Sequence, residues 1–464
     1  MSDEKGTFNK WQQEQSYLEE QKKIHPELFV KTEGLDLSGQ LSRVGIVLPH
    51  APIASGFIKY FPFDFIVEEI KKDQQVVSID YEEPKTPTGA GAFVRADVVK
   101  IGVSTVDVIK ELANKLKIKE TQIGYGGIKD AVALTAQNFS FSGITPEALM
   151  QLPVTNHFLK NIQFANDSVS MNNVSGNRFT ILIRTKDSID EEKLRERIEV
   201  LSKDGFWNFY WMQRFGNRLL SHWWGLLLLQ GKEERVVRSY LCEPGPNESP
   251  FFANLRKLAN TKFEKWEEII ELYKPFEFTL RNELIILNHL KEFRHDYTGA
   301  LRAIPEQVKL WLYAYASFLF NKSLSFAASS GEVPQKLPLL LSNNPKDYEM
   351  YKQFLEADKI PLDFAQKIRR FDFIRFVPRS VETKLIAKII SYKIIPEGLI
   401  ISFELPKGSY ATTFLSQIIT LDASLVNQVS TNEVDIKEIL GTGSISKTKE
   451  IFKNYTVLRQ KEED

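Results

Sequence analysis

The chain has 464 residues, enough for two or three domains of ordinary size. Its 60 Lys and Arg residues balance 60 Asp and Glu residues, and this zero net charge excludes a polybasic protein that coats nucleic acid by bulk charge. A hydrophobic content of 43% excludes a disordered chain, and the single cysteine, Cys242, excludes an intramolecular disulfide and a CxxC zinc site.

The N-terminal region is polar, and we interpret residues 1–40 as an extension. Phe8, Trp11, Tyr17 and Leu18 fall at helical spacing, which predicts one amphipathic helix. The first residues contain no apolar stretch that resembles a signal peptide. The longest aliphatic run, Leu226 to Leu229, is far shorter than the ~20 residues of a membrane helix. We therefore expect a cytoplasmic protein without a membrane segment.

From residue 46 to residue 153 the pattern alternates between strands and helices. Strand-like runs cover 65–70, 93–99 and 133–141. Between them, Ser104 is followed by apolar residues at helical spacing, which predicts a capped helix start. The segment 123–127 is interpreted as a glycine-rich break.

A further strand is predicted at 178–184, followed by a charged helix at 190–203. Helical patterns then dominate, and the longest runs from Pro305 to about Gly331. Strand character returns at 399–405. The pattern predicts an α+β fold with an N-terminal extension (1–40), a first part of the sheet domain (41–204), a helical insertion (205–385), a second part (386–425) and a C-terminal tail (426–464).

The densest candidate site is the segment from Tyr125 to Gln137. Two glycines allow a loop that presents Lys129 and Asp130, and the strand that follows anchors it. A desolvated aspartate on such a loop acts as a nucleophile or a general base. The alternative is a turn whose aspartate only accepts backbone amides, and from these residues alone the turn is the more common case.

Three weaker features lie elsewhere in the chain. The pair Gly176-Asn177 precedes Phe179 at the start of a strand, where an aromatic ring can stack on a base, although a simple turn fits equally. Aromatics interleave with polar residues from Asn208 to Gly216. Residues 367–393 hold eight basic residues against two acidic ones, which fits phosphate contacts or a solvated face.

Together these segments resemble the TruD family of tRNA pseudouridine synthases, because five motifs occur in the family's order. They are Lys59 through the Pro62-x-Asp64-Phe65-x-Val67-x-Glu69 segment, Gly127-Ile-Lys129-Asp130-x-x-Ala133-x-Thr135-x-Gln137, Gly176-Asn177-Arg178-Phe179, Asn208 through Gln213-Arg214-Phe215-Gly216, and Phe403 through Thr412. The motifs span roughly residues 55–420.

The resemblance implies a mixed sheet with flanking helices and a largely helical insertion domain. It implies isomerisation of a uridine in tRNA, typically uridine 13 in the D arm, to pseudouridine without metal or cofactor. By the motif match, Asp130 takes the place of the catalytic aspartate and Phe179 that of the aromatic beside the target base. The other residues expected to bind substrate are Lys59, Phe65, Lys129, Thr135, Gln137, Asn177 and Arg214.

Two departures from the family pattern leave an alternative open. Ala131 and Val132 stand where the family usually has basic residues, and Trp211 replaces a usual glycine. An RNA-binding or RNA-chaperone protein of the same fold with weakened catalysis is therefore the second hypothesis. An unrelated α+β enzyme would require five ordered motifs to occur by chance. We expect tRNA as the partner of a monomer without an obligate protein partner.

Overall fold

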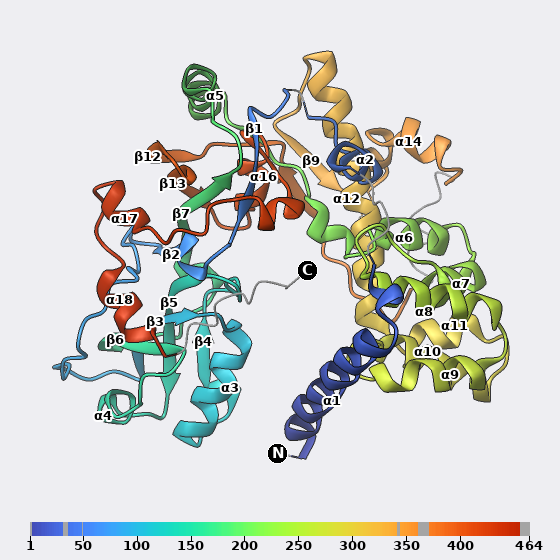
Figure 1. The fold of residues 1–464 in the computed structure, drawn as a ribbon, viewed down its shortest axis with the longest axis horizontal. Coiled ribbons are helices and arrows are strands. Elements are labelled where there is room, and N and C mark those ends of the chain that lie inside the picture. The colour runs from blue at the N-terminus through green and yellow to red at the C-terminus, as the bar shows by residue number, and fades with distance from the viewer. Residues whose placement is uncertain (1, 31–35, 49, 341–343, 361–370, 455–464) are drawn as a thin grey trace. The chain divides into compact units, whose positions relative to one another are not determined.

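The computed structural model describes residues 2–30, 36–48, 50–340, 344–360 and 371–454, without the side chains of residues 2–12. The chain divides into two compact units, each made of two chain segments. The sheet unit comprises His50–Asn208 and Lys384–Asp464, and the helical unit comprises Met1–Pro49 and Phe209–Thr383. Figure 1 shows the elements of both units.

A mixed sheet forms the centre of the sheet unit. Among the described residues it has ten strands: β1 Ala54–Ile58, β2 Phe65–Lys71, β3 Phe93–Ile101, β4 Ile123–Tyr125, β5 Leu134–Ser142, β6 His157–Ala165, β7 Val174–Thr185, β12 Lys388–Ile395, β13 Gly398–Pro406 and β14 Ile419–Leu421. The main order is β12-β13-β7-β2-β5-β3-β6, while β1 pairs with β7 and β14, and β4 pairs with β5. Strands β2 and β5 are parallel, whereas β7 pairs antiparallel with both β2 and β13. A separate short pair joins β8 Phe206–Trp207 to β11 Lys384–Leu385.

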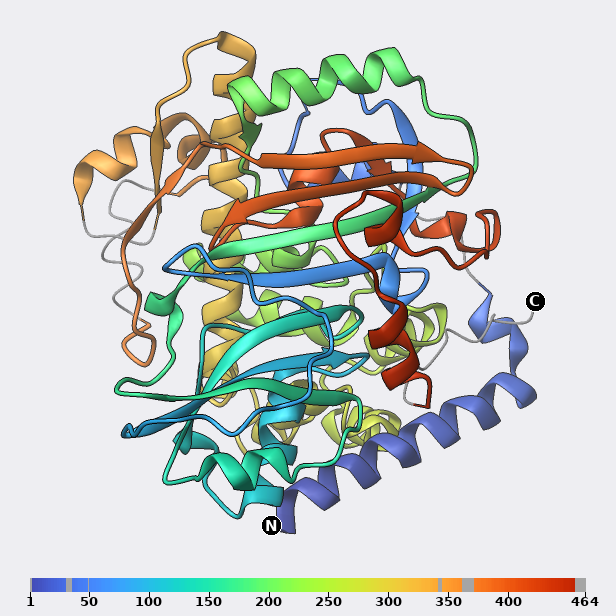
Figure 2. The same cartoon turned by 90° about the vertical axis from the view of Figure 1, so that its left-hand side faces the viewer.

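Helices cover both faces of the sheet because its strands are apolar on both sides. On one face lie α3 Thr105–Leu116, α4 Pro146–Met150, α5 Glu191–Asp204 and α16 Ala411–Leu415, which pack on alternate residues such as Val67, Phe139 and Phe403. On the other face lie α17 Ile436–Ile439 and α18 Ser446–Phe452, drawn in red in Figure 2, which pack on Ile66 and Leu134.

Strand register decides which polar residues share the face covered by α3 and α5. Val67 pairs with Thr135 and Phe179, Thr135 pairs with Lys100, and Glu69 pairs with Asn177. Directly paired residues point to the same side of a sheet. A set of polar side chains from β2, β3, β5 and β7 therefore meets on one face, between two apolar clusters.

The helical unit is built around one long helix. Its helices are α1 Ser2–Ile24, α2 Leu37–Arg43, α6 Ser221–Leu229, α7 Glu233–Cys242, α8 Pro250–Thr261, α9 Trp266–Tyr273, α10 Arg281–Glu292, α11 Tyr297–Arg302, α12 Pro305–Ser330, α13 Pro345–Glu349 and α14 Lys352–Ala357. Strands β9 Lys336–Leu339 and β10 Arg379–Glu382 form an antiparallel pair. Helix α6 packs against α12 so closely that a Cβ on Gly225 would stand 2.3 Å from the Trp311 carbonyl oxygen.

Two segments differ from the sequence interpretation. The glycine-rich segment 123–127 was expected to be a break, but its first three residues form β4, whose Gly124 pairs with Ser140. A Cβ on Gly124 would stand 2.3 Å from the Ser168 hydroxyl, so this glycine serves close packing within a strand. The chain after residue 426 contributes Ile436, Ile445 and Phe452 to the core, and residues 1–49 group with the helical unit.

The predicted N-terminal helix is present as α1, but the side chains of Phe8 and Trp11 lie outside the described residues. Tyr17 contacts the ring of Phe276, with 5.5 Å between ring centroids. Among the described helices, none is both long enough and apolar enough to cross a membrane.

Candidate active site

The loop between β4 and β5 carries Asp130 at the edge of the polar face. Gly127 has a φ of 150°, and a Cβ on the neighbouring Gly126 would stand 2.2 Å from the Val174 side chain, so both positions require glycine. The Asp130 side chain remains 31% exposed, which leaves its carboxylate accessible to a substrate.

Both oxygens of the Asp130 carboxylate are held. Oδ1 accepts a hydrogen bond from the backbone N of Val132 at 2.9 Å, and Oδ2 forms an ion pair with Lys59. Lys59 has a φ of 62°, in the left-handed region that a lysine rarely adopts. Backbone strain of this kind is concentrated at functional sites, where the surrounding structure must hold it.

A chain of buried polar groups supports the loop from below. The hydroxyl of Thr105 accepts from the backbone N of Lys129 at 2.9 Å and donates to Gln137 Oε1 at 3.0 Å. Gln137 Nε2 donates to the Gly127 carbonyl at 3.0 Å. These bonds tie both ends of the loop to α3 and β5. Since the side chains of Gln137 and Thr135 have no exposed surface, they lie under the loop and do not line the accessible surface.

Lys100 is a second buried support. Its Nζ donates to the carbonyl oxygens of Asp130 at 2.7 Å and Val103 at 2.8 Å, and the residue is only 1% exposed. Burial lowers the pKa of Lys100 to about 8, while the charge of Asp130 acts to raise it and that of Lys129 to lower it. The backbone position of Asp130 is therefore fixed by a cation from β3.

Lys129 points away from Asp130 into the sheet. Its Nζ donates to Asn177 Oδ1 at 2.7 Å and forms a 3.0 Å ion pair with Glu69 Oε2, and Glu69 is 1% exposed. The other oxygen of Glu69 accepts from the backbone N of Asn138 at 3.1 Å. This buried pair links the loop to β2, β5 and β7.

Aromatic rings lie beside the Lys59–Asp130 pair. The Lys59 Nζ stands 4.6 Å from the centroid of the Phe65 ring, and the Phe65 and Phe179 centroids are 6.3 Å apart at 75°. Phe179 stacks on Phe403 at 5.3 Å and is 7% exposed. The two rings therefore form an apolar wall next to the carboxylate, with most of their area in the core.

Arg214 belongs to the helical unit. Its Nε donates to the Ser317 hydroxyl at 3.1 Å, and its guanidinium lies near the rings of Tyr210 and Tyr313. Of the residues proposed from the sequence, Lys59, Phe65, Lys129, Asp130, Asn177 and Phe179 meet in the sheet unit, with Thr135 and Gln137 beneath them.

Sequence reasoning missed Lys100, Thr105 and Glu69 as parts of the site. A signal for two of them is present, because Lys100 and Glu69 are charged residues within otherwise apolar strand patterns. A charge in a buried strand requires a partner. Which partner each finds depends on the register between strands, which a single sequence does not display.

Comparison with known proteins identifies the fold family. Residues 47–338, more than half of the chain, match the family model described as tRNA pseudouridine synthase D (TruD). The chain belongs to the TruD family.

Curated relatives and a solved structure agree with this assignment. The chain is 28% identical over 404 residues to a protein of Methanococcus aeolicus named "Probable tRNA pseudouridine synthase D", covering 79% of this chain and 96% of the relative. It is 26% identical over 411 residues to tRNA pseudouridine synthase D of Syntrophotalea carbinolica, covering 80% and 98%. A crystal structure of a Methanosarcina mazei protein assigned as tRNA pseudouridine synthase D (TruD) superimposes with a TM-score of 0.66 at 21% identity, covering 83% and 98%. The last comparison confirms the α+β fold.

Proposed function

We propose that this protein isomerises a uridine of tRNA to pseudouridine, with Asp130 as the catalytic residue and no cofactor. The observation that carries the proposal is the partly exposed carboxylate of Asp130, which forms an ion pair with Lys59, a residue in a strained conformation. Buried polar groups fix the loop that carries Asp130. By family expectation the target is uridine 13 in the D arm.

The reaction breaks the bond between C1′ and N1 and forms a bond between C1′ and C5. The base must rotate between these steps, so the uridine has to leave its stack and enter a pocket. Asp130 either attacks the sugar at C1′ or removes a proton at C2′, and either role needs a positioned, accessible carboxylate. Because uridine and pseudouridine contain the same atoms, the reaction consumes no co-substrate.

Each neighbouring residue has a distinct proposed role. Lys59 orients the carboxylate through the ion pair, and the edges of Phe65 and Phe179 face the flipped base. Lys129 and Asn177 hold the loop against β7, and the half-buried Asn177 offers its amide to the base. Thr135 and Gln137 act as positioning residues, since both are fully buried. Arg214 is proposed to contact tRNA from the helical unit.

The structure bears on the departure at positions 131 and 132. Val132 is 50% exposed, so an apolar side chain replaces a charge at an accessible place beside Asp130. The backbone N of Val132 still donates to Asp130 Oδ1 at 2.9 Å. The departure therefore changes the charge beside Asp130 without removing the support of the carboxylate, which favours catalysis over the RNA-chaperone alternative.

The test is chemical mapping of pseudouridine in unmodified tRNA transcripts after incubation with purified protein. We expect wild type to form pseudouridine at one position, Asp130→Asn and Asp130→Ala to form none, and Asp187→Ala, an exposed control in the sheet unit, to match wild type. If wild type binds tRNA but forms no pseudouridine, or if Asp130→Ala is as active as wild type, the catalytic proposal is wrong. Pseudouridine at a position other than 13 would overturn only the choice of target.

A further inference from the structure

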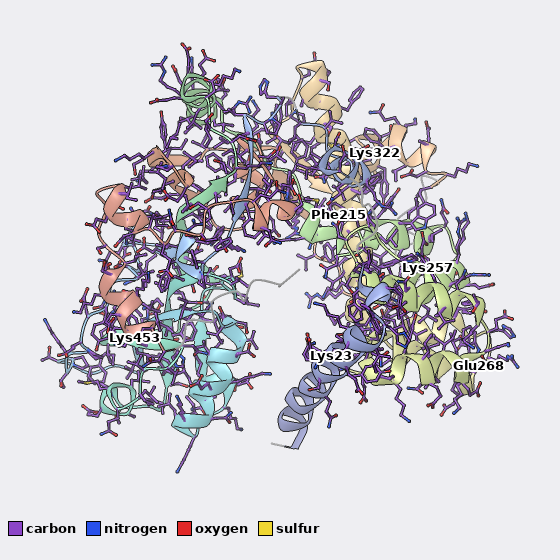
Figure 3. The ribbon with its side chains drawn as sticks, in the orientation of Figure 1. Lys23, Phe215, Lys257, Glu268, Lys322 and Lys453 are labelled. Atoms are coloured by element: carbon purple, nitrogen blue, oxygen red, sulfur yellow. The ribbon has the colours of Figure 1, made fainter. Side chains whose placement is uncertain are left out.

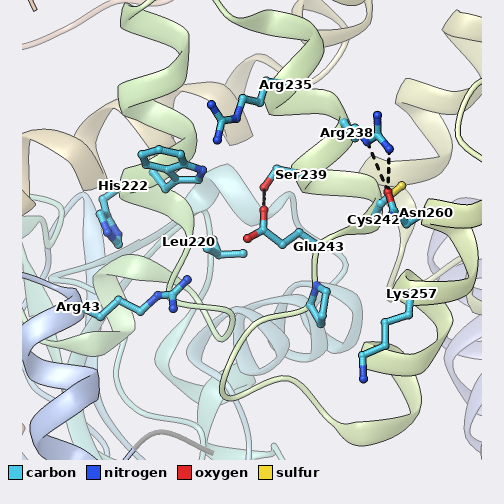
Figure 4. A pocket seen from close by; sticks show the side chains of 12 residues that line it. Arg43, Leu220, His222, Arg235, Arg238, Ser239, Cys242, Glu243, Lys257 and Asn260 are labelled. Carbon is cyan, nitrogen blue, oxygen red and sulfur yellow. Dashed lines mark hydrogen bonds between the residues drawn. The ribbon is translucent and has the colours of Figure 1, made fainter. Parts of the chain in front are cut away.

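The helical unit contains a pocket that the proposed reaction does not use. Its volume is about 650 Å³, within the range of sites for small molecules. The wall is formed by residues from α2, the start of α6, α7 and α8 (Figure 4). All of these elements belong to the same unit, so the pocket is complete without the sheet unit.

Four cationic side chains surround this pocket: Arg43, Arg235, Arg238 and Lys257. Figure 4 shows Arg43, Arg235 and Lys257 approaching it from three sides, and Lys257 comes from α8 (Figure 3). Within the part of the chain that the structure describes, none of the four forms an ion pair with a carboxylate. The three arginines make polar or ring contacts instead, such as Arg238 to the Asn260 side chain at 3.4 Å.

The remaining titratable groups of the wall leave this positive charge uncompensated. The one acidic residue of the wall, Glu243, accepts a hydrogen bond from the Ser239 hydroxyl at 2.5 Å. Burial lowers the pKa of His222 to about 3, with a further decrease from Arg43, so this ring is neutral. Burial raises the pKa of the Cys242 thiol to about 12, which keeps it neutral as well. The pocket therefore carries four positive charges against one negative charge, as an anion site requires.

The floor of the pocket is rigid because the end of α7 is anchored by buried groups. Arg218 Nη1 donates to the carbonyls of Tyr240 at 2.9 Å and Glu243 at 3.0 Å, and Arg256 Nη1 also donates to Tyr240 at 2.9 Å. A Cβ on Gly245 would stand 2.2 Å from the Arg218 Cα. The segment that carries Ser239 and Glu243 is thus fixed before any ligand binds.

A strained residue places one of the four cations. Leu219 has a φ of 51°, in the left-handed region, and its carbonyl accepts a hydrogen bond from Arg43 Nε at 3.3 Å. A bulky side chain in this conformation is costly, so the surrounding structure must hold it. The conformation aims a carbonyl at Arg43, which orients that guanidinium at the wall of the pocket.

An aromatic ring completes the wall. Trp223 is half-buried at the pocket, and the guanidinium of Arg235 lies 5.3 Å from its ring centroid. The neighbouring His222 is 9% exposed, and its Nδ1 has no hydrogen-bond partner among the described residues. A ligand with a phosphate and a flat polar ring would match the cations and the indole face.

We propose that this pocket binds a nucleotide, with its phosphate among Arg43, Arg235 and Lys257 and its base beside Trp223. The nucleotide is either part of a bound RNA or a free mononucleotide. The first case rests on the proposed function, and the second does not. Both sources share the same chemistry, and the two arms of the test distinguish them.

The test uses the full-length protein with a charge-reversed pair, Arg235→Glu with Lys257→Glu, both of which are exposed in the free protein. Lys274→Glu with Lys291→Glu, two exposed residues of the helical unit that do not line the pocket, is the charge-matched control. The probes are an unmodified tRNA transcript, uridine monophosphate and inorganic phosphate, measured by equilibrium binding at fixed salt. Thermal unfolding followed by circular dichroism verifies that each variant is folded.

For an RNA source we expect the paired reversal to raise the Kd for tRNA about tenfold, against little change for the control. For a free nucleotide we expect loss of uridine monophosphate binding with an unchanged Kd for tRNA. Trp223→Leu, which keeps every charge, is expected to bind uridine monophosphate no better than inorganic phosphate.

The proposal is overturned if the paired reversal and the Lys274→Glu with Lys291→Glu control have the same affinity for both tRNA and uridine monophosphate, or if wild type binds neither probe. Unchanged preference for uridine monophosphate over phosphate in Trp223→Leu overturns the placement of the base. Failure of the proposed catalytic function is separate, because it is read from pseudouridine formation and leaves these affinities measurable.

Discussion

Lys100 connects the charge of the candidate site to the stability of the sheet unit. Its folded pKa of about 8 lies below the usual 10.5 because the ammonium is buried. Below pH 8 the group is charged in both states, and the cost of burying the charge is fully present. Between pH 8 and 10.5 the folded state releases the proton while the unfolded state keeps it, so this group makes the protein more stable as pH rises.

We predict that wild type gains about 3 kcal/mol of unfolding free energy relative to Lys100→Met between pH 8 and 10.5. The measurement is urea unfolding of both proteins across that range. A difference that stays constant or falls with pH would show that burial does not lower the pKa of Lys100. Lys117→Met, an exposed lysine just after α3, should show no such pH dependence relative to wild type.

Phe179 belongs both to the proposed base pocket and to the core, since it is 7% exposed and stacks on Phe403. Truncation to alanine would remove core packing and cost about 3–5 kcal/mol, which obscures any catalytic effect. We therefore predict the outcome for leucine. Phe179→Leu should slow pseudouridine formation at saturating tRNA about tenfold with a smaller change in tRNA binding.

Phe403→Leu is the matched control for this prediction, because it removes the same stacked contact from the other side. It should lose comparable stability in urea unfolding and retain nearly the wild-type rate. If Phe403→Leu slows the reaction as much as Phe179→Leu, or if Phe179→Leu weakens binding and turnover equally, the ring does not act at the base.

The sequence predicted that Asp130 lies near Lys59, but it did not predict how the side chains around them contact one another. Motif order pointed to Lys59 and Asp130, 71 positions apart, and the structure pairs them. Thr135 and Gln137 occur in the same motif, yet their burial makes them supports. Lys100 entered no motif, because its role depends on the pairing of β3 with β5. Side-chain contacts between strands follow from register, which needs the folded chain.

At the scale of elements, local signals predicted strands β2, β3, β5, β7 and β13 and helices α1, α3, α5 and α12, but not the other helices of the helical unit. The Ser104 side chain caps α3 by accepting from the backbone N of Asp107, and α12 ends at Gly331 with a φ of 82°. Local signals did not show where the C-terminal segment packs. Its apolar residues are spread over short helices, and only tertiary contact reveals that they cover one face of the sheet.

A buried ion pair joins this C-terminal segment to the sheet. Lys437 Nζ lies 2.9 Å from Glu68 Oε1, both side chains are nearly inaccessible, and Glu68 also accepts from the backbone N of Ile79 at 3.0 Å. Removing one member of such a pair leaves an unpaired buried charge. We predict that Lys437→Met costs about 3–5 kcal/mol of unfolding free energy.

The paired variant Glu68→Gln with Lys437→Met tests that explanation. The neutral amide oxygen can still accept from Ile79, so the double variant should be more stable than Lys437→Met alone. Urea unfolding of the two single variants and the double variant closes the cycle. Additive losses would show that the two side chains act independently and that helix α17 is held by apolar packing alone.

At the scale of the whole molecule, equal numbers of acidic and basic residues do not describe the surface. Several charged side chains form buried ion pairs, among them Arg184 with Asp64 at 2.7 Å and Arg256 with Glu283 at 2.9 Å. The basic segment 367–393 is also less positive than its composition indicates. Its Lys388 pairs with Glu404 at 3.0 Å. Lys367, Arg369 and Arg370 of the same segment lie outside the described residues. Nucleic acid would therefore meet a few local cations, such as those of the pocket in the helical unit.

Salt dependence of tRNA binding measures how many such cations contact phosphate. About five contacts correspond to a slope near −4 in a plot of log association constant against log salt concentration, whereas a strongly basic protein approaches −10. We predict a slope near −4 for wild type, measured by equilibrium binding between 50 and 200 mM salt. If RNA occupies the pocket, Arg235→Glu with Lys257→Glu should flatten the slope by about 2, since each lost phosphate contact removes about 1.

An affinity that does not change with salt would mean that tRNA recognition does not involve phosphates. A slope near −10 would mean that bulk charge controls tRNA binding although the net charge of the protein is zero.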